Sequence, residues 1–174
     1  TKRISKIVNG LKRYSYQNTE IEFINASLPK ILNDSLILVE LNAKKYNVRI
    51  DFSSNKQDNE KIIVSCDPIL IQQVVINFVN NAVDAIKSKD ERWIRILIEK
   101  SLGKVRVNVV DSGKGIDDNG EKFLFVPFYT TKKIGDGTGL GLSISKGIIE
   151  DHNGKIGYGL YQENTCFWFE LPSS

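Results

Sequence analysis

Hydrophobic residues recur at helical spacing near the beginning of the chain. Within residues 1–18, the apolar positions follow one another after three or four residues or in adjacent pairs, which places them on one side of a helix. They are Ile4, Ile7, Val8, Leu11 and Tyr14. A single helix with one apolar stripe is marginal in water. We therefore expect residues 1–18 to pack against the rest of the protein or against another chain.

The rest of the chain changes between two hydrophobic periods. Strands are predicted where apolar and polar residues alternate, and helices where apolar residues return every three or four positions. The expected strands cover residues 20–24, 48–52, 61–66, 92–100, 104–111, 155–162 and 165–171. The expected helices cover residues 27–43, 67–87 and 140–152, and the glycine-rich residues 112–138 are irregular.

Start and stop signals support the predicted helices. Ser27 and Asp67 are good N-cap residues, and each is followed by a proline in the first helical turn. Asn153-Gly154 is typical of a helix end. This order of elements predicts an α/β (α+β) two-layer sandwich: a mixed, largely antiparallel sheet with helices on one face, preceded by an N-terminal helix stub.

The composition is that of one globular domain. The chain has 174 residues and a mass of 19.6 kDa, and 41% of its residues are hydrophobic. The net charge of +3 gives no reason to expect a nucleic-acid partner. No apolar run is expected to span a membrane. The absence of Met suggests a piece of a longer protein, two cysteines make no disulfide framework, and one histidine, His152, limits imidazole chemistry.

The helix expected over residues 67–87 carries a stripe of amides on an otherwise apolar surface. Gln73, Asn77 and Asn81 are four residues apart and share one face. One interpretation is an amphipathic helix with this face in water, although such faces usually carry Lys and Glu. The other is a binding site, because amide oxygens bind hard cations such as Mg²⁺ and amide N–H groups bind phosphate oxygens.

A second feature is DSGKGI, residues 111–116, at the end of a valine-rich strand. Gly113 and Gly115 allow a sharp turn and the close approach of a ligand. The carboxylate of Asp111 can accept a hydrogen bond from an exocyclic amine such as that of adenine. Taken alone, the pattern favours an ordinary turn.

A third feature is GDGTGLGLSI, residues 135–144, which leads directly into a predicted helix. Backbone N–H groups at the beginning of a helix bind phosphate. The sequence lacks the Gly-Lys-Ser/Thr of a Walker loop and the Gly-x-Gly-x-x-Gly spacing of dinucleotide-binding folds. Lys132 and Lys133, just upstream, either contact phosphate or are solvated loop lysines.

In this order, the three features resemble the ATP-binding domain of the histidine kinase, gyrase, heat-shock chaperone and mismatch-repair superfamily. QQVVINFVNNAVDA resembles its N box, DSGKGI its first glycine box and GTGLGLSI its second. FLFVPFYTTK resembles the F box of sensor histidine kinases. The resemblance covers about Thr19 to Pro172 and implies ATP and Mg²⁺ as cofactors.

The resemblance assigns roles to single residues. Asn81 matches the Mg²⁺ ligand, Asn77 the N-box Asn near the phosphates and Asp111 the carboxylate that recognises adenine. The segment 117–136 matches the mobile ATP lid. The remaining expected nucleotide-binding positions are Gly113, Gly115, Ile116, Thr131, Lys132, Gly137, Thr138, Gly139, Leu140, Gly141, Leu142 and Thr165.

The resemblance also implies a function. Residues 1–18 correspond to the end of the second helix of a dimerisation and phosphoacceptor hairpin, and residues 19–174 to the catalytic domain of a sensor histidine kinase. Gln73, Asn77 and Lys132 are its candidate catalytic residues. The intact protein is expected to be a cytoplasmic or membrane-tethered homodimer. It would transfer the γ-phosphoryl group of ATP to a hairpin His and then to a response regulator.

Three departures from the family pattern bear on this interpretation. Gln73 stands where the ATPase members carry a Glu base, which disfavours efficient ATP hydrolysis. Val126 replaces the usual acid of the F box, and Asn164 replaces a frequent Gly. His152 lies far from the phosphate turn, so we expect it to have a structural role at the surface and the acceptor His to be absent from this chain. Two alternatives stay open: an ATPase or anti-sigma-type serine kinase of the same superfamily, and a nucleotide-binding module without phosphotransfer.

Overall fold

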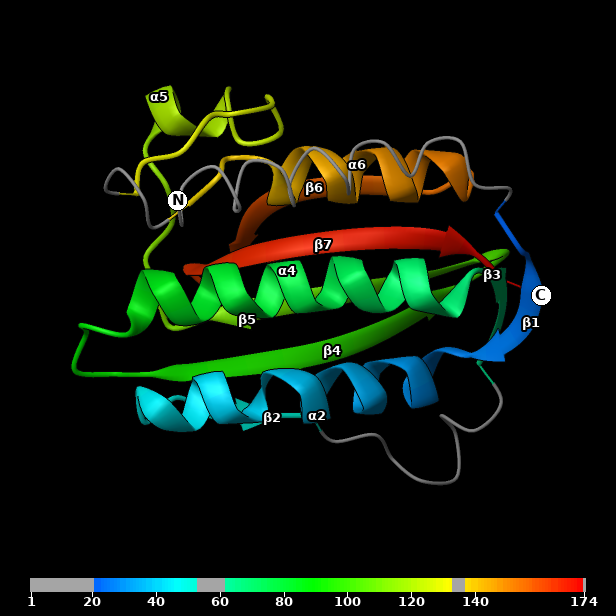
Figure 1. Cartoon of the computed structure of the whole chain (residues 1–174), viewed down its shortest axis with the longest axis horizontal. Helices are drawn as coiled ribbons and strands as arrows, with labels where there is room; N and C mark the ends of the chain where they lie inside the picture. Colours follow the sequence, from blue (N-terminus) through cyan, green and yellow to red (C-terminus); the bar gives the residue numbers. More distant parts are fainter. Residues whose placement is uncertain (1–20, 53–61, 133–136, 174) are drawn as a thin grey trace, which may run out of the picture.

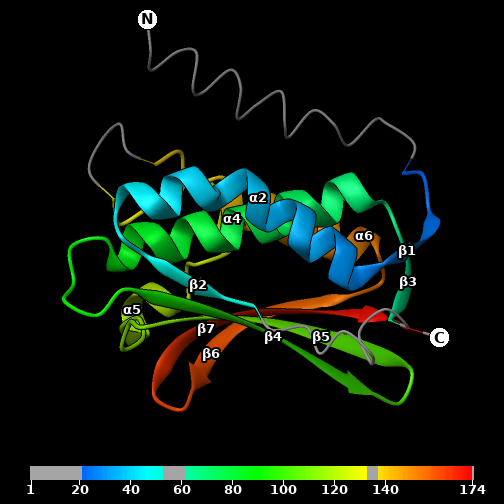
Figure 2. The same ribbon diagram turned by 90° about the horizontal axis from the view of Figure 1, so that it is seen from below.

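The computed structural model describes residues 21–52, 62–132 and 137–173. The helix expected over residues 1–18, and Lys133 in the glycine-rich region, lie outside this part of the chain. The described residues form two layers, with the helices packed on one face of a sheet (Figures 1 and 2). This is the two-layer sandwich that the sequence predicts.

The main sheet is mixed and mostly antiparallel, as expected. Its strand order is β2-β4-β5-β7-β6, and within the described residues β2 and β4 make its parallel pair. The strands are β2 (Arg49–Asp51), β4 (Trp93–Ser101), β5 (Lys104–Asp111), β6 (Lys155–Tyr161) and β7 (Asn164–Pro172). The two predicted hairpins, β4-β5 and β6-β7, are confirmed.

A separate antiparallel pair joins β1 (Ile24–Ser27) to β3 (Ile63–Cys66). The expected position of the first strand, residues 20–24, is wrong, because residues 21–23 are not in a strand and pairing begins at Ile24. Ile24 lies opposite Cys66, the last residue of β3. The N-cap of the next helix follows Cys66 directly, so the ladder has no partner left for residues before Ile24.

Three long helices form the second layer: α2 (Leu28–Lys45), α4 (Pro68–Ile86) and α6 (Gly141–Asp151). The hydroxyl of Ser27 accepts a hydrogen bond from the N–H of Lys30 at 3.4 Å. The carboxylate of Asp67 accepts from two N–H groups of the first turn of α4, at 3.0 and 3.2 Å. Both predicted N-caps are confirmed, and each satisfies donors that the helix itself leaves unpaired.

The core is centred on α4, which lies between α2 and α6 (Figure 1) and above the sheet (Figure 2). The ring centroid of Phe78 lies 5.5 Å from that of Phe167 and 6.2 Å from that of Phe169. Contrary to the sequence expectation, α4 is long and apolar enough to cross a membrane by length and composition. In this fold the apolar character of α4 serves the core, because its buried side chains pack there.

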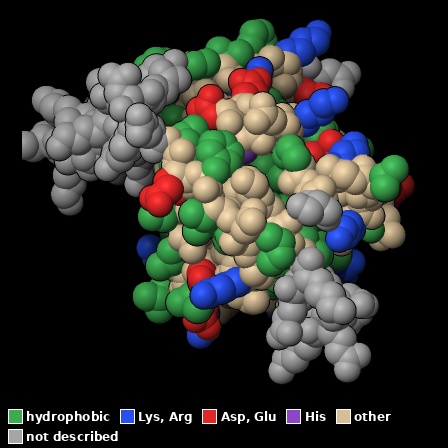
Figure 3. Space-filling model, turned by 90° about the vertical axis from the view of Figure 1, so that its right-hand side faces the viewer, with side chains coloured by type: hydrophobic (Ala, Val, Ile, Leu, Met, Phe, Trp, Pro, Cys, Tyr) green, Lys and Arg blue, Asp and Glu red, His purple; other side chains and the backbone are tan. Residues whose placement is uncertain are grey.

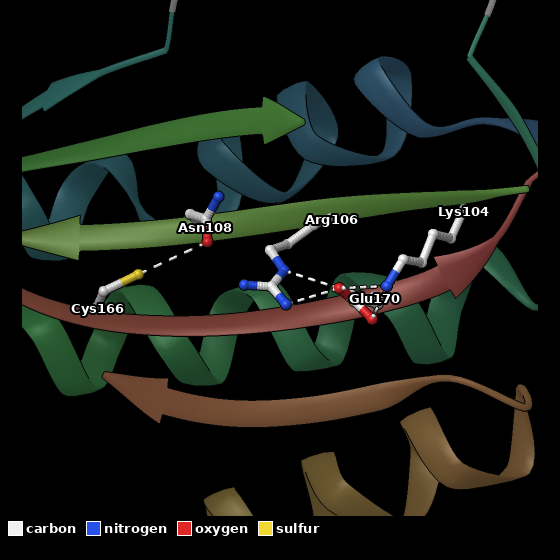
Figure 4. A network of polar contacts seen from close by, with 5 residues as sticks. All are labelled: Lys104, Arg106, Asn108, Cys166 and Glu170. Carbon is white, nitrogen blue, oxygen red and sulfur yellow. Dashed lines mark hydrogen bonds and ion pairs between the residues drawn. The ribbon is translucent and has the colours of Figure 1, made fainter. Parts of the chain in front are cut away.

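The sheet face turned away from the helices carries a network of polar contacts (Figure 4). Glu170 on β7 accepts hydrogen bonds from Arg106 at 2.7 and 2.9 Å and from Lys104 at 3.1 and 3.2 Å. The guanidinium of Arg106 also lies over the ring of Trp168, 4.1 Å from its centroid. Burial acts to raise the pKa of Glu170, but these hydrogen bonds outweigh it and hold the pKa below its ordinary value.

The position expected for His152 is wrong, although its role is structural. The side chain is 2% exposed at the C-terminal end of α6. Nδ1 lies 2.7 Å from the carbonyl oxygen of Ile148, and Nε2 accepts a hydrogen bond from the N–H of Asp67 at 3.0 Å. The ring also contacts that of Phe23 at 5.0 Å. Figure 3 views this end of the molecule and shows almost no imidazole at the surface.

We predict that His152→Ala lowers the free energy of unfolding by about 2–4 kcal/mol, because it opens a cavity and leaves the N–H of Asp67 unpaired. His152→Phe retains an aromatic ring without the hydrogen bonds, so its free energy of unfolding should lie between those of wild type and His152→Ala. Urea denaturation followed by circular dichroism measures both. The exposed neighbour Asp151→Ala is the control, expected within about 0.5 kcal/mol of wild type. Equal stability of His152→Ala and the control would contradict the buried role.

Candidate functional site

Three segments that are distant in the sequence meet at one end of the two layers. They are the end of β5, the second half of α4 and the beginning of α6 (left in Figure 1). The short helix α5 (Asp118–Glu121) lies at the same end, within the segment expected to be the ATP lid. The described lid residues, 117–132, therefore lie next to the three predicted motifs.

Asp111 is the last residue of β5 and is 1% exposed. Its Oδ1 accepts a hydrogen bond from the N–H of Gly113 at 2.7 Å. Burial raises the pKa of Asp111 to about 6, although the Gly113 hydrogen bond, the charge of Lys89 and a hydrogen bond from Thr165 act in the opposite direction. A carboxyl group with a pKa of about 6 is mostly ionised at neutral pH, so Asp111 can accept a hydrogen bond from an amine.

The loop after Asp111 is fastened to the closing hairpin. The hydroxyl of Thr165 accepts from the N–H of Gly115 at 3.0 Å, and the hydroxyl of Tyr158 accepts from the N–H of Ile116 at 2.6 Å. The side-chain amide of Asn164 donates to the carbonyl oxygen of Gly113 at 3.2 Å. The predicted residues Gly115, Ile116 and Thr165 are thus brought together here. Tyr158 and the role of Asn164 were missed, because nothing in the local sequence links them to this loop.

Two glycines of this loop are required, Gly113 by lack of space and Gly115 by its backbone angle. A Cβ at Gly113 would lie 2.5 Å from Oδ1 of Asp111 and 2.6 Å from the hydroxyl oxygen of Thr165. Gly115 has φ +93°, and its Cβ would lie 3.0 Å from the side chain of Leu160. The backbone can therefore approach the carboxylate closely only without a side chain.

The amide stripe of α4 is partly buried rather than free in water. Nδ2 of Asn77 donates to the carbonyl oxygen of Gly141 and to the hydroxyl of Ser145, both at 3.2 Å. Asn77 therefore joins α4 to the first turn of α6. Gln73 lies half-buried one turn before it. This favours the site interpretation of the stripe over that of a solvated face.

The third amide, Asn81, faces an ammonium group. Nζ of Lys132 donates to Oδ1 of Asn81 at 3.4 Å and to the carboxylate of Asp84 at 2.6 Å. The other carboxylate oxygen of Asp84 accepts from Lys87 at 2.9 Å. Partial burial acts to raise the pKa of Asp84, but the two lysines outweigh it and lower the pKa. Sequence reasoning found Asn81 and Lys132 but missed Asp84, whose importance depends on the approach of a residue 48 positions away.

The second glycine motif is a tight turn that leads into α6. Gly139 has φ +66°, and a Cβ there would lie 2.4 Å from the backbone of Phe128, whose N–H donates to the carbonyl oxygen of Gly139. The N–H of Leu140 donates to the hydroxyl of Thr138 at 3.4 Å. Among the described residues, no side chain caps the beginning of α6. Its first N–H groups can therefore bind an anion.

The remaining predicted positions fall around this turn with different exposures. Thr131 and Thr138 are exposed. Leu140 is buried, and Leu142 packs against the core. A Cβ on Gly137 would crowd Lys132, and one on Gly141 would touch Asn77 at 3.6 Å. The turn thus lies between the lysine and the amide of the stripe.

Together these groups suit an elongated ligand with an amine at one end and phosphates at the other. A buried carboxylate lies at the end of β5, and an anion-binding helix terminus and a lysine lie beside α4. In the described part of the chain, no three His, Cys, Asp or Glu side chains gather as a metal cluster. The candidate ligand for a cation is instead the amide oxygen of Asn81, which accepts a hydrogen bond from the ammonium of Lys132.

Known proteins share this sequence and this fold. Residues 66–174 match the family described as histidine kinase-, DNA gyrase B- and HSP90-like ATPase. The histidine-protein kinase AtoS of Escherichia coli K12 is 35% identical over 162 residues, which are 90% of this chain and 26% of AtoS. The chain thus spans about a quarter of that relative's length.

Solved structures agree with this assignment. The nucleotide-free catalytic domain of the histidine kinase ThkA superposes with a TM-score of 0.74 at 39% identity, over 87% of this chain and 95% of that one. ThkA in complex with the response regulator TrrA gives a TM-score of 0.77 at 34% identity, over 98% of this chain and 48% of that one. The chain therefore belongs to the histidine kinase, DNA gyrase B and HSP90-like ATPase family, as a catalytic ATPase domain of the sensor histidine kinase type.

Proposed function

We propose that this domain binds Mg-ATP and, in the intact kinase, transfers the γ-phosphoryl group to a histidine on a hairpin outside the described residues. The observation that carries the proposal is Asp111, a carboxylate 1% exposed at a strand end, held by Gly113 and Thr165. Burying a carboxylate costs stability, and recognition of the adenine amine gives a functional reason for Asp111 at this position.

The same proposal assigns the metal to α4. We propose Asn81 as the Mg²⁺ ligand, with nucleotide phosphates and water completing the coordination shell. Its Oδ1 accepts a hydrogen bond from the ammonium of Lys132 at 3.4 Å, so this oxygen is turned toward a cationic group. When bound, Mg²⁺ would neutralise phosphate charge in the transition state.

The chain's own groups would bind and orient the phosphates. The N–H groups at the beginning of α6 face them, Asn77 fixes that turn against α4, and Lys132 adds a positive charge. The further contacts proposed for the nucleotide are Gly113, Gly115, Ile116, Thr131, Gly137, Thr138, Gly139, Leu140, Gly141, Leu142 and Thr165. We propose that Gln73 lies beside the phosphates, where an amide cannot take a proton from water, which favours an imidazole acceptor over hydrolysis.

The wider organisation is also proposed. Residues 1–18 would end the second hairpin helix, residues 19–174 would be the catalytic domain, and residues 117–136 the ATP lid. The hairpin would dimerise, the phosphoryl group would pass to a response regulator, and the domain would work in the cytoplasm. The complex of ThkA, a relative, with the response regulator TrrA supports the proposed transfer to a response regulator.

Asp111→Asn should weaken binding of a non-hydrolysable ATP analogue with Mg²⁺ by roughly 10–100-fold, because a buried charge-assisted hydrogen bond to adenine is lost. Isothermal titration calorimetry measures the affinity, and thermal unfolding confirms that the variant is folded. Asp151→Asn, the same change at an exposed carboxylate at the far end of α6, should bind like wild type. Undiminished binding by Asp111→Asn would overturn the adenine assignment.

Binding should also depend on pH. The pKa of Asp111 is raised to about 6, so lowering the pH through 6 protonates the carboxylate and removes the acceptor. Affinity should be constant above about pH 7 and fall roughly tenfold by pH 5 for a single group with this pKa. Adenosine is the appropriate ligand, since its lack of phosphates leaves Asp111 as the group tested. Asp111→Asn should show a flat profile, and an equally steep one would exclude Asp111 as the cause.

Phosphotransfer to a separate hairpin distinguishes the alternatives. With labelled ATP, a purified His-bearing hairpin from a related kinase should acquire label that is stable to base and labile to acid. Steady ATP turnover by the domain alone, lost in Gln73→Ala, would support an ATPase instead. Tight nucleotide binding with no label on any hairpin or protein substrate would indicate a binding module without phosphotransfer.

A further inference from the structure

Asp84, which the proposed function has not used, is the centre of a cluster of ion pairs. Its two carboxylate oxygens bind different cations: Oδ2 lies 2.6 Å from Nζ of Lys132 and Oδ1 lies 2.9 Å from Nζ of Lys87. All three side chains are only partly exposed, at 29% for Asp84, 33% for Lys132 and 38% for Lys87. The cluster is therefore better shielded from solvent than the ion pair of Glu40 and Lys44, whose side chains are 56% and 69% exposed.

The two partners of Asp84 come from different parts of the chain. Lys87 caps the same helix, three residues after Asp84. Lys132 is the last residue of the F-box motif FLFVPFYTTK, and the ion pair brings it onto α4. There its ammonium also donates to Oδ1 of Asn81, at 3.4 Å. Asp84 thus holds Lys132 beside the amide oxygen that is proposed to bind Mg²⁺.

Holding a lysine in one place has a measurable consequence. A free lysine side chain has four rotatable bonds, and fixing it on a ligand costs rotamer entropy. An ion pair formed before the ligand arrives restricts those rotamers in advance. The carboxylate does not make the cluster anionic, because the two ammonium groups and one carboxylate leave it with one net positive charge.

We propose that Asp84 is a positioning residue, which fixes the Lys132 ammonium beside Asn81 so that the ammonium meets the γ-phosphate of bound ATP. This rests on the proposed nucleotide site. Asp84 acts through Lys132 and touches neither adenine nor the buried carboxylate of Asp111. Its effect should therefore depend on the number of phosphates of the ligand.

The test measures affinities of the 174-residue chain for Mg-ADP and for a non-hydrolysable Mg-ATP analogue. Asp84→Asn should weaken binding of the ATP analogue about 3–10-fold and change that of ADP by less than twofold. Asp84→Glu, which retains the charge, should recover part of the loss. Glu40→Gln removes the acid of the Glu40–Lys44 pair on α2 and should leave both affinities unchanged.

A double-mutant cycle separates positioning from a general structural effect. In the Lys132→Met background, Asp84→Asn should change the ratio of the two affinities by less than twofold, because its intermediary is gone. Equal losses for ADP and the ATP analogue, an unchanged ratio in Asp84→Asn, or tighter ATP-analogue binding would each overturn the proposal. If Asp84→Asn does not fold, Asp84→Glu takes its place in the cycle, and full additivity with Lys132→Met overturns it.

The outcome is distinguishable from failure of the proposed function. If wild type binds neither nucleotide, the site assignment itself fails. If wild type binds both and Asp111→Asn weakens both, the site stands, and the ADP-to-ATP ratio alone decides the role of Asp84.

Discussion

The packing of α4 between α2, α6 and the sheet is the constraint on which the rest of the structure depends. The helix fills the core with residues such as Phe78 and Val79, which are fully buried. Such a helix has little freedom to rotate or slide, because interiors are close-packed. Its remaining polar edge is therefore held in a fixed place. Asn77 and Asn81 are rigid for the same reason that the core is stable.

This fixed helix lets the second glycine turn, which leads into α6, approach it closely. Asn77 donates to the first turn of α6, so the glycine turn is built against α4 rather than beside it. Gly139 has room for no side chain near Phe128, and Gly113 has none near Asp111. These contacts give two irregular segments a defined backbone conformation. The order of the site thus comes from crowding and a few hydrogen bonds, not from regular secondary structure.

The fold and the motifs could be predicted from sequence where the information is local. Hydrophobic period and the caps at Ser27 and Asp67 defined the helices, and the glycines identified the loops. The failures depend on distant partners. His152 is buried because α4 begins beside it, 85 residues earlier in the chain. Tyr158 and Asp84 look like ordinary strand and helix residues until Ile116 and Lys132 are brought to them. Strand β1 was misplaced because its register is set by β3.

The Asp111 end and the Lys132 end of the site are held by different structural elements, and this separation bears on the mechanism. The carboxylate of Asp111 is held by β5, the loop and Thr165, whereas Lys132 is held by Asp84 on α4. Binding energy gained at a part of a substrate that does not react can be used to place the part that does. The contact proposed for adenine at Asp111 and the contact proposed for the phosphates at Lys132 fit that division. An amide at Gln73 fits it too, because a site that supplies position and charge needs no base of its own when the acceptor is an imidazole.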